Sequence, residues 1–253
     1  MILENKIVLV TGGSSGIGAE IARQFRELGN EVIICGRNEE KLSAAAATLD
    51  VHPIRCDISA VSDCKRMLAE IRTEFGRIDV LVNCAGIMMM YDFTEEADTS
   101  ERLQNEIEIN AVAPLRLTHM ALPLMREAWE PAIVFVSSGL AYIPFPSTPA
   151  YSGTKALIHH SAMALRHQLA KIGVKVFELL PPVTDTPLAE GMDTGSFKKT
   201  PPADVVAELM SGMRKDKFEI PAGASKQLRL MSRIAPGFLF KQMVKQFGKG
   251  EQA

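Results

Sequence analysis

The 253-residue sequence lacks a run of eighteen apolar residues, the length that a membrane-spanning helix requires. Its first residues, MILENKIVLVTGG, contain only a short apolar run and no small-residue cleavage site, so they predict a first strand and not a signal peptide. An excess of basic residues is also absent, because 28 Lys and Arg stand against 30 Asp and Glu. This balance argues against a protein whose main ligand is a nucleic acid.

Cysteine is scarce and forms no recognisable motif. None of the four cysteines belongs to a CxxC pair, and no histidine stands at zinc-ligand spacing from them: Cys35, Cys56, Cys64 and Cys84. We therefore expect no metal site. Three of them lie in or beside apolar runs, where a free cysteine packs as a small hydrophobic residue. The pattern indicates a reducing compartment, and we expect a cytoplasmic protein.

The sequence also lacks linkers, low-complexity segments and internal repeats, which favours one large domain. Short apolar runs predict strands at 6–12, 31–36, 51–58, 78–86, 131–139, 174–182 and 217–223. Helical patterns fall at 17–28, 38–49, 61–75, about 100–126 and 151–172. This order predicts an α/β fold, a doubly wound and mostly parallel sheet flanked by helices, over residues 1–220. Residues 221–253 are expected to form a tail.

A glycine-rich segment, TGGSSGIGAEIA, follows the first predicted strand. Gly12, Gly16 and Gly18 stand where the chain passes from this strand into the first helix. Glycines there let the backbone turn tightly and let a pyrophosphate approach the helix N-terminus, where free N–H groups favour an anion. The alternative is a plain tight turn. The position between a first strand and a first helix favours the dinucleotide site.

A second candidate site is the pair Tyr151 and Lys155 in PAYSGTKALIHH. Residues four apart lie on one face of a helix, and most such pairs are ordinary surface neighbours. A cation beside a tyrosine can lower the phenol pKa from its ordinary value near 10, which would make the pair a proton donor and its activating cation. The spacing alone does not decide between these two interpretations.

The glycine segment, NCAG at 83–86 and Tyr151-x-x-x-Lys155 together resemble the short-chain dehydrogenase/reductase family, in that family's order, over residues 4 to about 190. The resemblance implies a Rossmann-type oxidoreductase whose Tyr151 donates a proton and whose Lys155 assists it and holds the nicotinamide ribose. Ser138 would orient the substrate oxygen, with Ser137 as the alternative, and Asn110 would hold a relay water. The structural alternatives are a strand-end cap for Ser138 and a mid-helix hydrogen bond for Asn110.

The resemblance also implies a set of cofactor-binding residues. Three substitutions depart from the family pattern. Cys84 replaces an asparagine in the NCAG segment, and in the PPVTDT segment Pro182 replaces a glycine and Thr184 replaces a valine. Proline should stiffen the backbone that faces the nicotinamide carboxamide. The implied residues are Gly12, Ser14, Ser15, Gly16, Ile17, Gly18, Arg37, Asp57, Ile58, Asn83, Ala85, Gly86, Tyr151, Lys155, Pro181, Thr184 and Thr186.

The end of the second predicted strand, CGRNEE, bears on the choice of cofactor. Gly36 stands where NAD-binding proteins usually place an acidic residue, and Arg37 follows it. A 2′-phosphate fits where the acid is missing, and a guanidinium can bind it with two hydrogen bonds, aided by Ser14 and Ser15. We therefore predict NADP(H) over NAD(H). The alternative is a solvated arginine.

The residues expected to line the substrate pocket carry almost no charge, which predicts a lipophilic or aromatic carbonyl compound or secondary alcohol as substrate. The alternative is that Met88 to Met90 only fill the core. The expected lining is Met88, Met89, Leu140, Tyr142, Ile143, Phe145, Leu188 and Met192.

The tail is basic and amphipathic, so it can pack on its own domain, on a partner subunit or on an anionic membrane surface. Family members dimerise through two long helices, here about 100–126 and 151–172, so we expect a homodimer in which the tail obstructs tetramer formation. Two other functions stay open: a peripheral membrane reductase acting on a lipid, and a non-catalytic cofactor sensor or scaffold. The complete catalytic set argues against the second.

Overall fold

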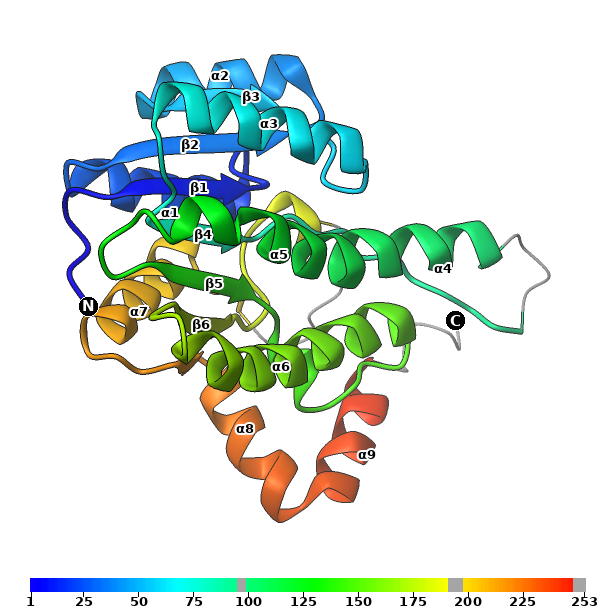
Figure 1. Ribbon diagram of the computed structural model, residues 1–253. Coiled ribbons are helices and arrows are strands. Elements are labelled where there is room, and N and C mark those ends of the chain that lie inside the picture. Colours follow the sequence, from blue (N-terminus) through cyan, green and yellow to red (C-terminus); the bar gives the residue numbers. More distant parts are fainter. Residues whose placement is uncertain (95–98, 191–197, 248–253) are drawn as a thin grey trace.

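The computed structural model describes residues 1–94, 99–190 and 198–247. Its centre is a seven-stranded sheet in the order β3-β2-β1-β4-β5-β6-β7 (Figure 1). Every neighbouring pair is parallel, so the carboxyl ends of all strands meet at one edge. The strands are β1 (Ile7–Thr11), β2 (Glu31–Gly36), β3 (His52–Arg55), β4 (Val80–Asn83), β5 (Ala132–Val136), β6 (Lys175–Leu180) and β7 (Glu219–Pro221). The predicted doubly wound α/β fold is confirmed.

Helices cover both faces of the sheet, which is why the strands are apolar on both sides. In β1, Val8 and Val10 join the core beneath α1 (Gly16–Glu27), α2 (Glu39–Leu49) and α7 (Pro202–Arg214). Ile7 and Leu9, which alternate with them, join the core beneath α3 (Val61–Glu74), α5 (Ala113–Met125) and α6 (Pro149–Ala170). Such period-two alternation between two buried faces is what a parallel strand requires.

Two helices differ from the sequence prediction. The helix expected over 100–126 is divided into α4 (Thr99–Ile107) and α5 by a π-helical turn, Glu108–Val112. Helix α7 was not predicted at all, although Val205, Leu209 and Met213 form a buried stripe on it. Its first residues are two prolines, which are acceptable before and at the first helical position but also occur in loops. The sequence signal for α7 was therefore present but ambiguous.

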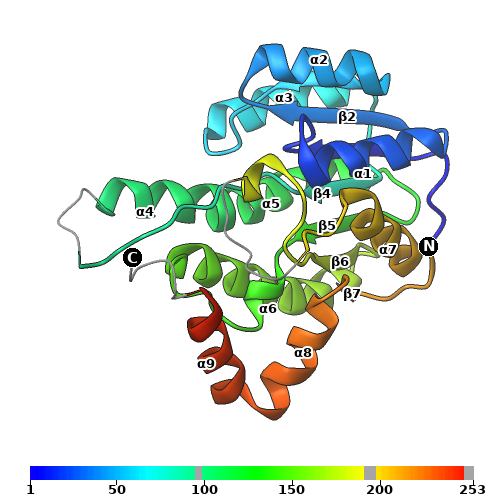
Figure 2. The same ribbon diagram turned by 180° about the vertical axis from the view of Figure 1, so that it is seen from behind.

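The tail forms two helices, α8 (Ser225–Ile234) and α9 (Pro236–Phe247), which together make a V-shaped projection beside β7 and α6 (Figures 1 and 2). Helix α8 packs on β7 and on the short 3₁₀ turn Gly139–Ala141, and α9 packs on α8. Other apolar side chains of the projection face outward, among them Leu230, Ile234 and Phe238. Within the described part of the chain, no helix is both long and apolar enough to cross a membrane.

Candidate active site

The glycine segment after β1 packs directly against the segment after β4. Gly12 has a φ of +68°, and a Cβ on it would lie 2.8 Å from Ala85 Cα, so this turn favours glycine. The hydroxyl of Thr11 accepts hydrogen bonds from the backbone N–H groups of Cys84 (3.0 Å) and Ala85 (3.1 Å). A Cβ on Gly18 would lie 2.3 Å from Gly12 O. The structure therefore brings the two motifs together at the carboxyl edge of the sheet.

The N-terminus of α1 has the features of an anion site. Ser15 is the N-cap residue, yet its exposed side chain makes no capping hydrogen bond, and Ser14 Oγ lies 3.7 Å from the position of a Cβ on Gly36. Arg37 is exposed and makes no hydrogen bond or ion pair with any residue that the structure describes. A helix N-terminus, two hydroxyls and a free guanidinium fit the phosphates of a dinucleotide.

The segment after β6 bridges the glycine turn and the loop that follows β5. A Cβ on Gly16 would lie 3.0 Å from Thr186 Cγ2, and Pro181 O accepts a hydrogen bond from Gly139 N (2.9 Å). Thr184 is buried, and its hydroxyl donates to Pro182 O (2.9 Å). Pro181, Thr184 and Thr186 thus stand between the predicted cofactor turn and the predicted catalytic serine.

Pro182 packs against Gly223, which leaves space for the proline ring. A Cβ on Gly223, just after β7, would lie 3.3 Å from Pro182 Cγ. Gly223 has a φ of +48° and no side chain, so it leaves room for the proline ring.

Tyr151, Lys155 and Ser138 converge at the N-terminal half of α6. Lys155 Nζ lies 5.3 Å from the centre of the Tyr151 ring and donates a hydrogen bond to Val136 O (2.9 Å). Tyr151 also shares a hydrogen bond with the Ser138 side chain. Ser138 itself is extended and caps the 3₁₀ turn through a bond from Leu140 N (3.1 Å). The hydroxyl therefore both caps the turn and meets the phenol.

Burial dominates the ionisation of this pair. It raises the pKa of Tyr151 above its ordinary value, while the bond with Ser138 lowers it less strongly. The same burial lowers the pKa of Lys155 to about 8, opposed by the negative charges of Glu178 and Glu106. The lowering of the Tyr151 pKa by Lys155, expected from the sequence, is not the net result here. A raised pKa keeps the phenol protonated, which is the state of a proton donor.

Asn110 lies inside the π-helical turn, where its side chain braces the chain after β4. Its Oδ1 accepts from Ile87 N (2.9 Å), and its Nδ2 donates to Ile87 O (2.7 Å). Gly86 stands between Asn110 and Lys155, since a Cβ there would lie 3.2 Å from Asn110 Oδ1 and 3.7 Å from Lys155 Nζ. Single π-helical turns occur frequently at functional sites.

Three of the implied cofactor residues also have structural roles. Asn83 Nδ2 donates to Thr118 Oγ1 (3.1 Å) beneath the sheet edge. Asp57 Oδ1 accepts from the backbone N (2.9 Å) and the hydroxyl (2.7 Å) of Ser59, so it closes its own turn. Ile58 is buried at the end of this turn. These bonds fix the loops without excluding contact with an adenine.

The expected substrate lining is only partly assembled. Met88 and Met89 are half-buried, Leu188 is exposed, and Met192 lies outside the described residues. Tyr142 is instead turned toward β7, where its hydroxyl donates to Glu219 Oε1 (2.6 Å). Ser137 points beneath the sheet edge and donates to Glu178, which favours Ser138 as the substrate-facing serine.

Two buried carboxylates were missed by the sequence analysis. Glu106 accepts hydrogen bonds from Met89 N (3.0 Å) and Tyr91 Oη (2.9 Å), and its burial raises its pKa. Glu178 is fully buried in β6. Its signal in the sequence is an acid within the otherwise apolar run VFELL, an arrangement that is costly unless the charge is paired.

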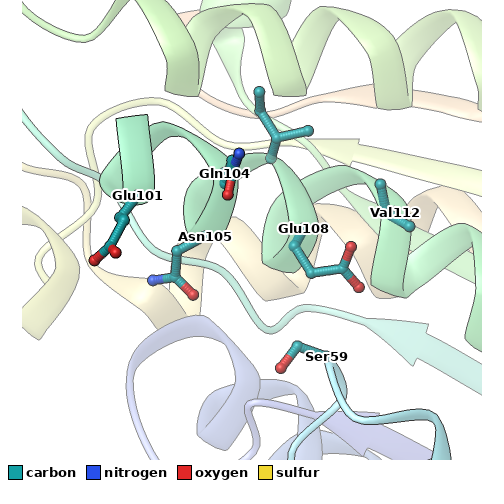
Figure 3. A pocket seen from close by; sticks show the side chains of 7 residues that line it. Ser59, Glu101, Gln104, Asn105, Glu108 and Val112 are labelled. Atoms are coloured by element: carbon teal, nitrogen blue, oxygen red, sulfur yellow. The ribbon is translucent and has the colours of Figure 1, made fainter. Parts of the chain in front are cut away.

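A separate groove of about 630 Å³ lies beside α4 (Figure 3). Asn105 and Glu108 lie on the side of α4 and the π-helical turn that faces Ser59 across this groove (Figure 3). None of the predicted catalytic residues lines it, and Glu108 is paired with Arg116 (2.8 Å). We therefore place the candidate active site where Ser138, Tyr151 and Lys155 meet, and not in the groove beside α4.

Comparison with known proteins agrees with this geometry. The profile of the short chain dehydrogenase family matches residues 6–196. An uncharacterized oxidoreductase of Bacillus subtilis (strain 168), DltE, is 37% identical over 247 residues, which are 96% of this chain and 98% of the relative. A short chain dehydrogenase from Burkholderia cenocepacia J2315 in complex with NADP has a TM-score of 0.85 at 25% identity, covering 96% of this chain and 99% of that one.

A structure from Burkholderia phymatum in complex with NAD has a TM-score of 0.84 at 20% identity and covers 96% of this chain and 97% of that one. At this identity the likeness concerns the fold alone. Similar chains have thus been solved with either nicotinamide dinucleotide.

Proposed function

Because this chain belongs to the short chain dehydrogenase family and is an oxidoreductase of that family, we propose that it transfers hydride between NADP(H) and a lipophilic or aromatic carbonyl compound or secondary alcohol. The observation that carries the proposal is the convergence of Tyr151, Ser138 and Lys155 at the carboxyl edge of the sheet. Ligands of open α/β sheets bind at this edge.

When bound, the nicotinamide supplies or accepts the hydride. In the reducing direction, Tyr151 donates its phenolic proton to the substrate oxygen as negative charge develops there, and Ser138 donates a hydrogen bond to the same oxygen. Lys155 is mainly cationic at pH values below about 8, so it stabilises the phenolate that remains. Asn110 is proposed to hold a relay water beside Lys155 while its side chain braces Ile87.

The preference for NADP(H) is supported by the residues around Gly36. No acid stands at the end of β2, and the next residue, Arg37, has no partner for its guanidinium among the described residues. Ser14 Oγ lies 3.7 Å from the position of a Cβ on Gly36. Gly12 and Gly18 leave the backbone open for a pyrophosphate at the start of α1. We propose that the remaining cofactor contacts are made along the same carboxyl edge of the sheet, by Asp57, the segment 83–86 and the segment 181–186.

We further propose a cytoplasmic homodimer. Ile107, Val112, Leu157 and Met163 are exposed on α4, the π-helical turn and α6, the helices through which the family pairs. Exposed large apolar side chains on long helices favour an isologous interface. The four cysteines are free, which agrees with a reducing compartment.

The proposed reaction is tested by following the absorbance of NADPH with a series of ketones from acetophenone to 2-decanone. We expect turnover with the apolar ketones and little with dihydroxyacetone phosphate or oxaloacetate. Efficient reduction of the charged substrates, with none of the apolar ketones, would contradict the proposed substrate class. Repeating the series with NADH tests the cofactor preference independently.

A second candidate, a reductase of membrane lipids, is favoured by the α8–α9 projection. Leu230, Ile234 and Phe238 are more than half exposed there (59%, 68% and 57%), near the cations Arg233 and Lys241. Co-sedimentation with phosphatidylglycerol vesicles, compared with phosphatidylcholine vesicles, tests this alternative. The replacement Ile234→Ser, which leaves the net charge unchanged, should weaken such binding. Trp129→Ser, on an exposed loop before β5, should not.

A further inference from the structure

A buried carboxylate, Glu178, lies directly behind the loop that presents Ser138. It follows Val174 and Val176 along the face of β6 that α6 covers, where a parallel strand would ordinarily continue with an apolar residue. A buried carboxylate is costly unless other groups pair with it. Such exceptions are retained mostly where they serve a function.

One oxygen of Glu178 holds the strand end that leads to Ser138. The hydroxyl of Ser137 donates to Glu178 Oε1, and the backbone N–H of Ser137 donates to Leu179 O (2.9 Å). Ser137 is therefore fixed through both its side chain and its backbone. Because Ser138 is the next residue, these bonds restrain the peptide from which its hydroxyl reaches Tyr151.

The other oxygen of Glu178 binds His159, whose Nδ1 lies 2.8 Å from Glu178 Oε2. Tyr151, Lys155 and His159 are spaced four residues apart on α6, so they follow one face of the helix. His159 is nearly buried, and its ring stands edge-on to that of Tyr142 at 5.4 Å. Glu178 thus connects the serine loop with the helix that carries the other two catalytic groups.

Charged groups from three elements surround the Glu178–His159 pair. Lys155 and Arg166 lie on α6, Glu219 lies on β7, and beyond it Arg229 of α8 pairs with Glu219 (2.8 Å). Glu219 also accepts the Tyr142 hydroxyl, so Tyr142 lies between the two carboxylates. The negative charge of Glu178 favours the cationic form of Lys155.

We propose that Glu178 is a positioning residue for the reduction: through Ser137 it fixes Ser138, through His159 it fixes the catalytic face of α6, and its charge supports the Lys155 cation. The inference rests on the proposed function, since it assigns a role beside Ser138, Tyr151 and Lys155. It adds a group that touches neither substrate nor cofactor.

The test compares Glu178→Gln, which keeps the shape and removes the charge, with Ser137→Ala, which keeps the charge and removes the hydroxyl. The matched control is Glu31→Gln, which removes an exposed Glu–His pair (3.1 Å) at the opposite side of the sheet. Each variant is assayed with NADPH and the ketone of the acetophenone-to-2-decanone series that the wild type reduces fastest. NADPH affinity is measured by nicotinamide fluorescence.

For Glu178→Gln we expect kcat to fall by about 10- to 100-fold, the effect of losing one hydrogen bond to a charged group, with little change in NADPH affinity. The alkaline decline of kcat/KM should also move to lower pH, because Lys155 loses a stabilising negative charge. Ser137→Ala should lower kcat without moving this decline, and Glu31→Gln should change neither. An unchanged kcat and pH profile for Glu178→Gln would overturn the proposal.

The pairing itself is checked without turnover by NMR titration of the imidazole signals, with His159→Gln used to assign the His159 signal. The Glu178 carboxylate raises the pKa of His159, so the signal should titrate at lower pH in Glu178→Gln. An identical His159 titration in both proteins would also overturn the proposal. Normal turnover by Tyr151→Phe would instead contradict the proposed function, whatever the result for Glu178.

Discussion

Ser225, the first residue of α8, lies directly against Gly139, the residue after Ser138. A Cβ on Gly139 would come within 2.5 Å of Ser225 Oγ and 3.0 Å of Leu228 Cδ1. Gly139 is therefore the position at which the tail meets the catalytic loop. From its sequence, the tail could pack on its own domain, on a partner subunit or on a membrane; in the structure, α8 packs on its own domain.

Replacing Gly139 with alanine should force α8 away from the loop. We expect Gly139→Ala to lower the free energy of unfolding by about 1–3 kcal/mol, the usual cost of overpacking, and to lower kcat because Ser138 is displaced. Urea unfolding and ketone reduction measure the two effects. Gly153→Ala is the matched control, since no atom lies within 4 Å of its added Cβ and alanine is favoured inside α6. Equal stability of the two variants would count against the contact.

Removal of the tail should change both assembly and activity. We expect light scattering to show a dimer for the full chain, because α8 packs on β7, the strand through which the family's tetramers pair, and α9 packs on α8. A chain ending after Ala224 uncovers Gly139 and should lose activity. A full-length tetramer, or a truncated protein unchanged in mass and activity, would refute the obstructing role of the tail.

The role of Tyr151 as proton donor can be tested by removing only its phenolic oxygen. Tyr151→Phe should lower kcat by roughly 10²–10⁴, the usual contribution of general acid catalysis, with little loss of NADPH affinity. Lys155→Ala should lower kcat similarly and also weaken NADPH binding. Steady-state kinetics and nicotinamide fluorescence separate these outcomes, and near-normal turnover by Tyr151→Phe would exclude this tyrosine as the donor.

The guanidinium of Arg37 should distinguish the two cofactors. We expect Arg37→Ala to weaken NADP(H) binding by about 1.5–3 kcal/mol and NAD(H) binding hardly at all, because only NADP(H) carries the 2′-phosphate. Fluorescence titration with each reduced cofactor measures the difference. Arg126→Ala, on an exposed residue after α5, serves as the control. An equal loss for both cofactors would show that Arg37 does not read the phosphate.

Lys155 should reduce stability while it serves catalysis. Its pKa is lowered to about 8 in the folded chain from an ordinary value of 10.5, so burying the cation destabilises the fold fully below pH 8. Lys155→Met should therefore raise the free energy of unfolding at pH 7, on the order of 1–2 kcal/mol, while abolishing turnover. The advantage should shrink between pH 8 and 10.5, as the native lysine loses its proton. Urea unfolding of both proteins between pH 8 and 10.5 tests this. A constant difference in their free energies of unfolding would show that the buried Lys155 cation does not destabilise the fold.

The sequence predicted the features that depend on local spacing. Gly12 to Gly18, and Tyr151 with Lys155, fall where a parallel sheet and its helices must place them. Burial was not visible in the spacing, so the raised pKa of Tyr151 was not foreseen. Glu178 and His159 are nineteen residues apart and meet only through the packing of α6 on β6.

In the π-helical turn Glu108–Val112, the helix departs from regular α-helical geometry at the residue that braces the site, Asn110. Residues 100–126 could be taken as one regular helix, and deleting a single residue, such as Ala111, would restore that register. The idealised helix would have better hydrogen-bond geometry, yet Asn110 would rotate by about 100° and leave Ile87. A designer who optimised this segment for helix stability alone would thus erase the brace beside Lys155. The π-helical turn is equivalent to one inserted residue, which sets the rotation of α4 relative to α5 about the helix axis.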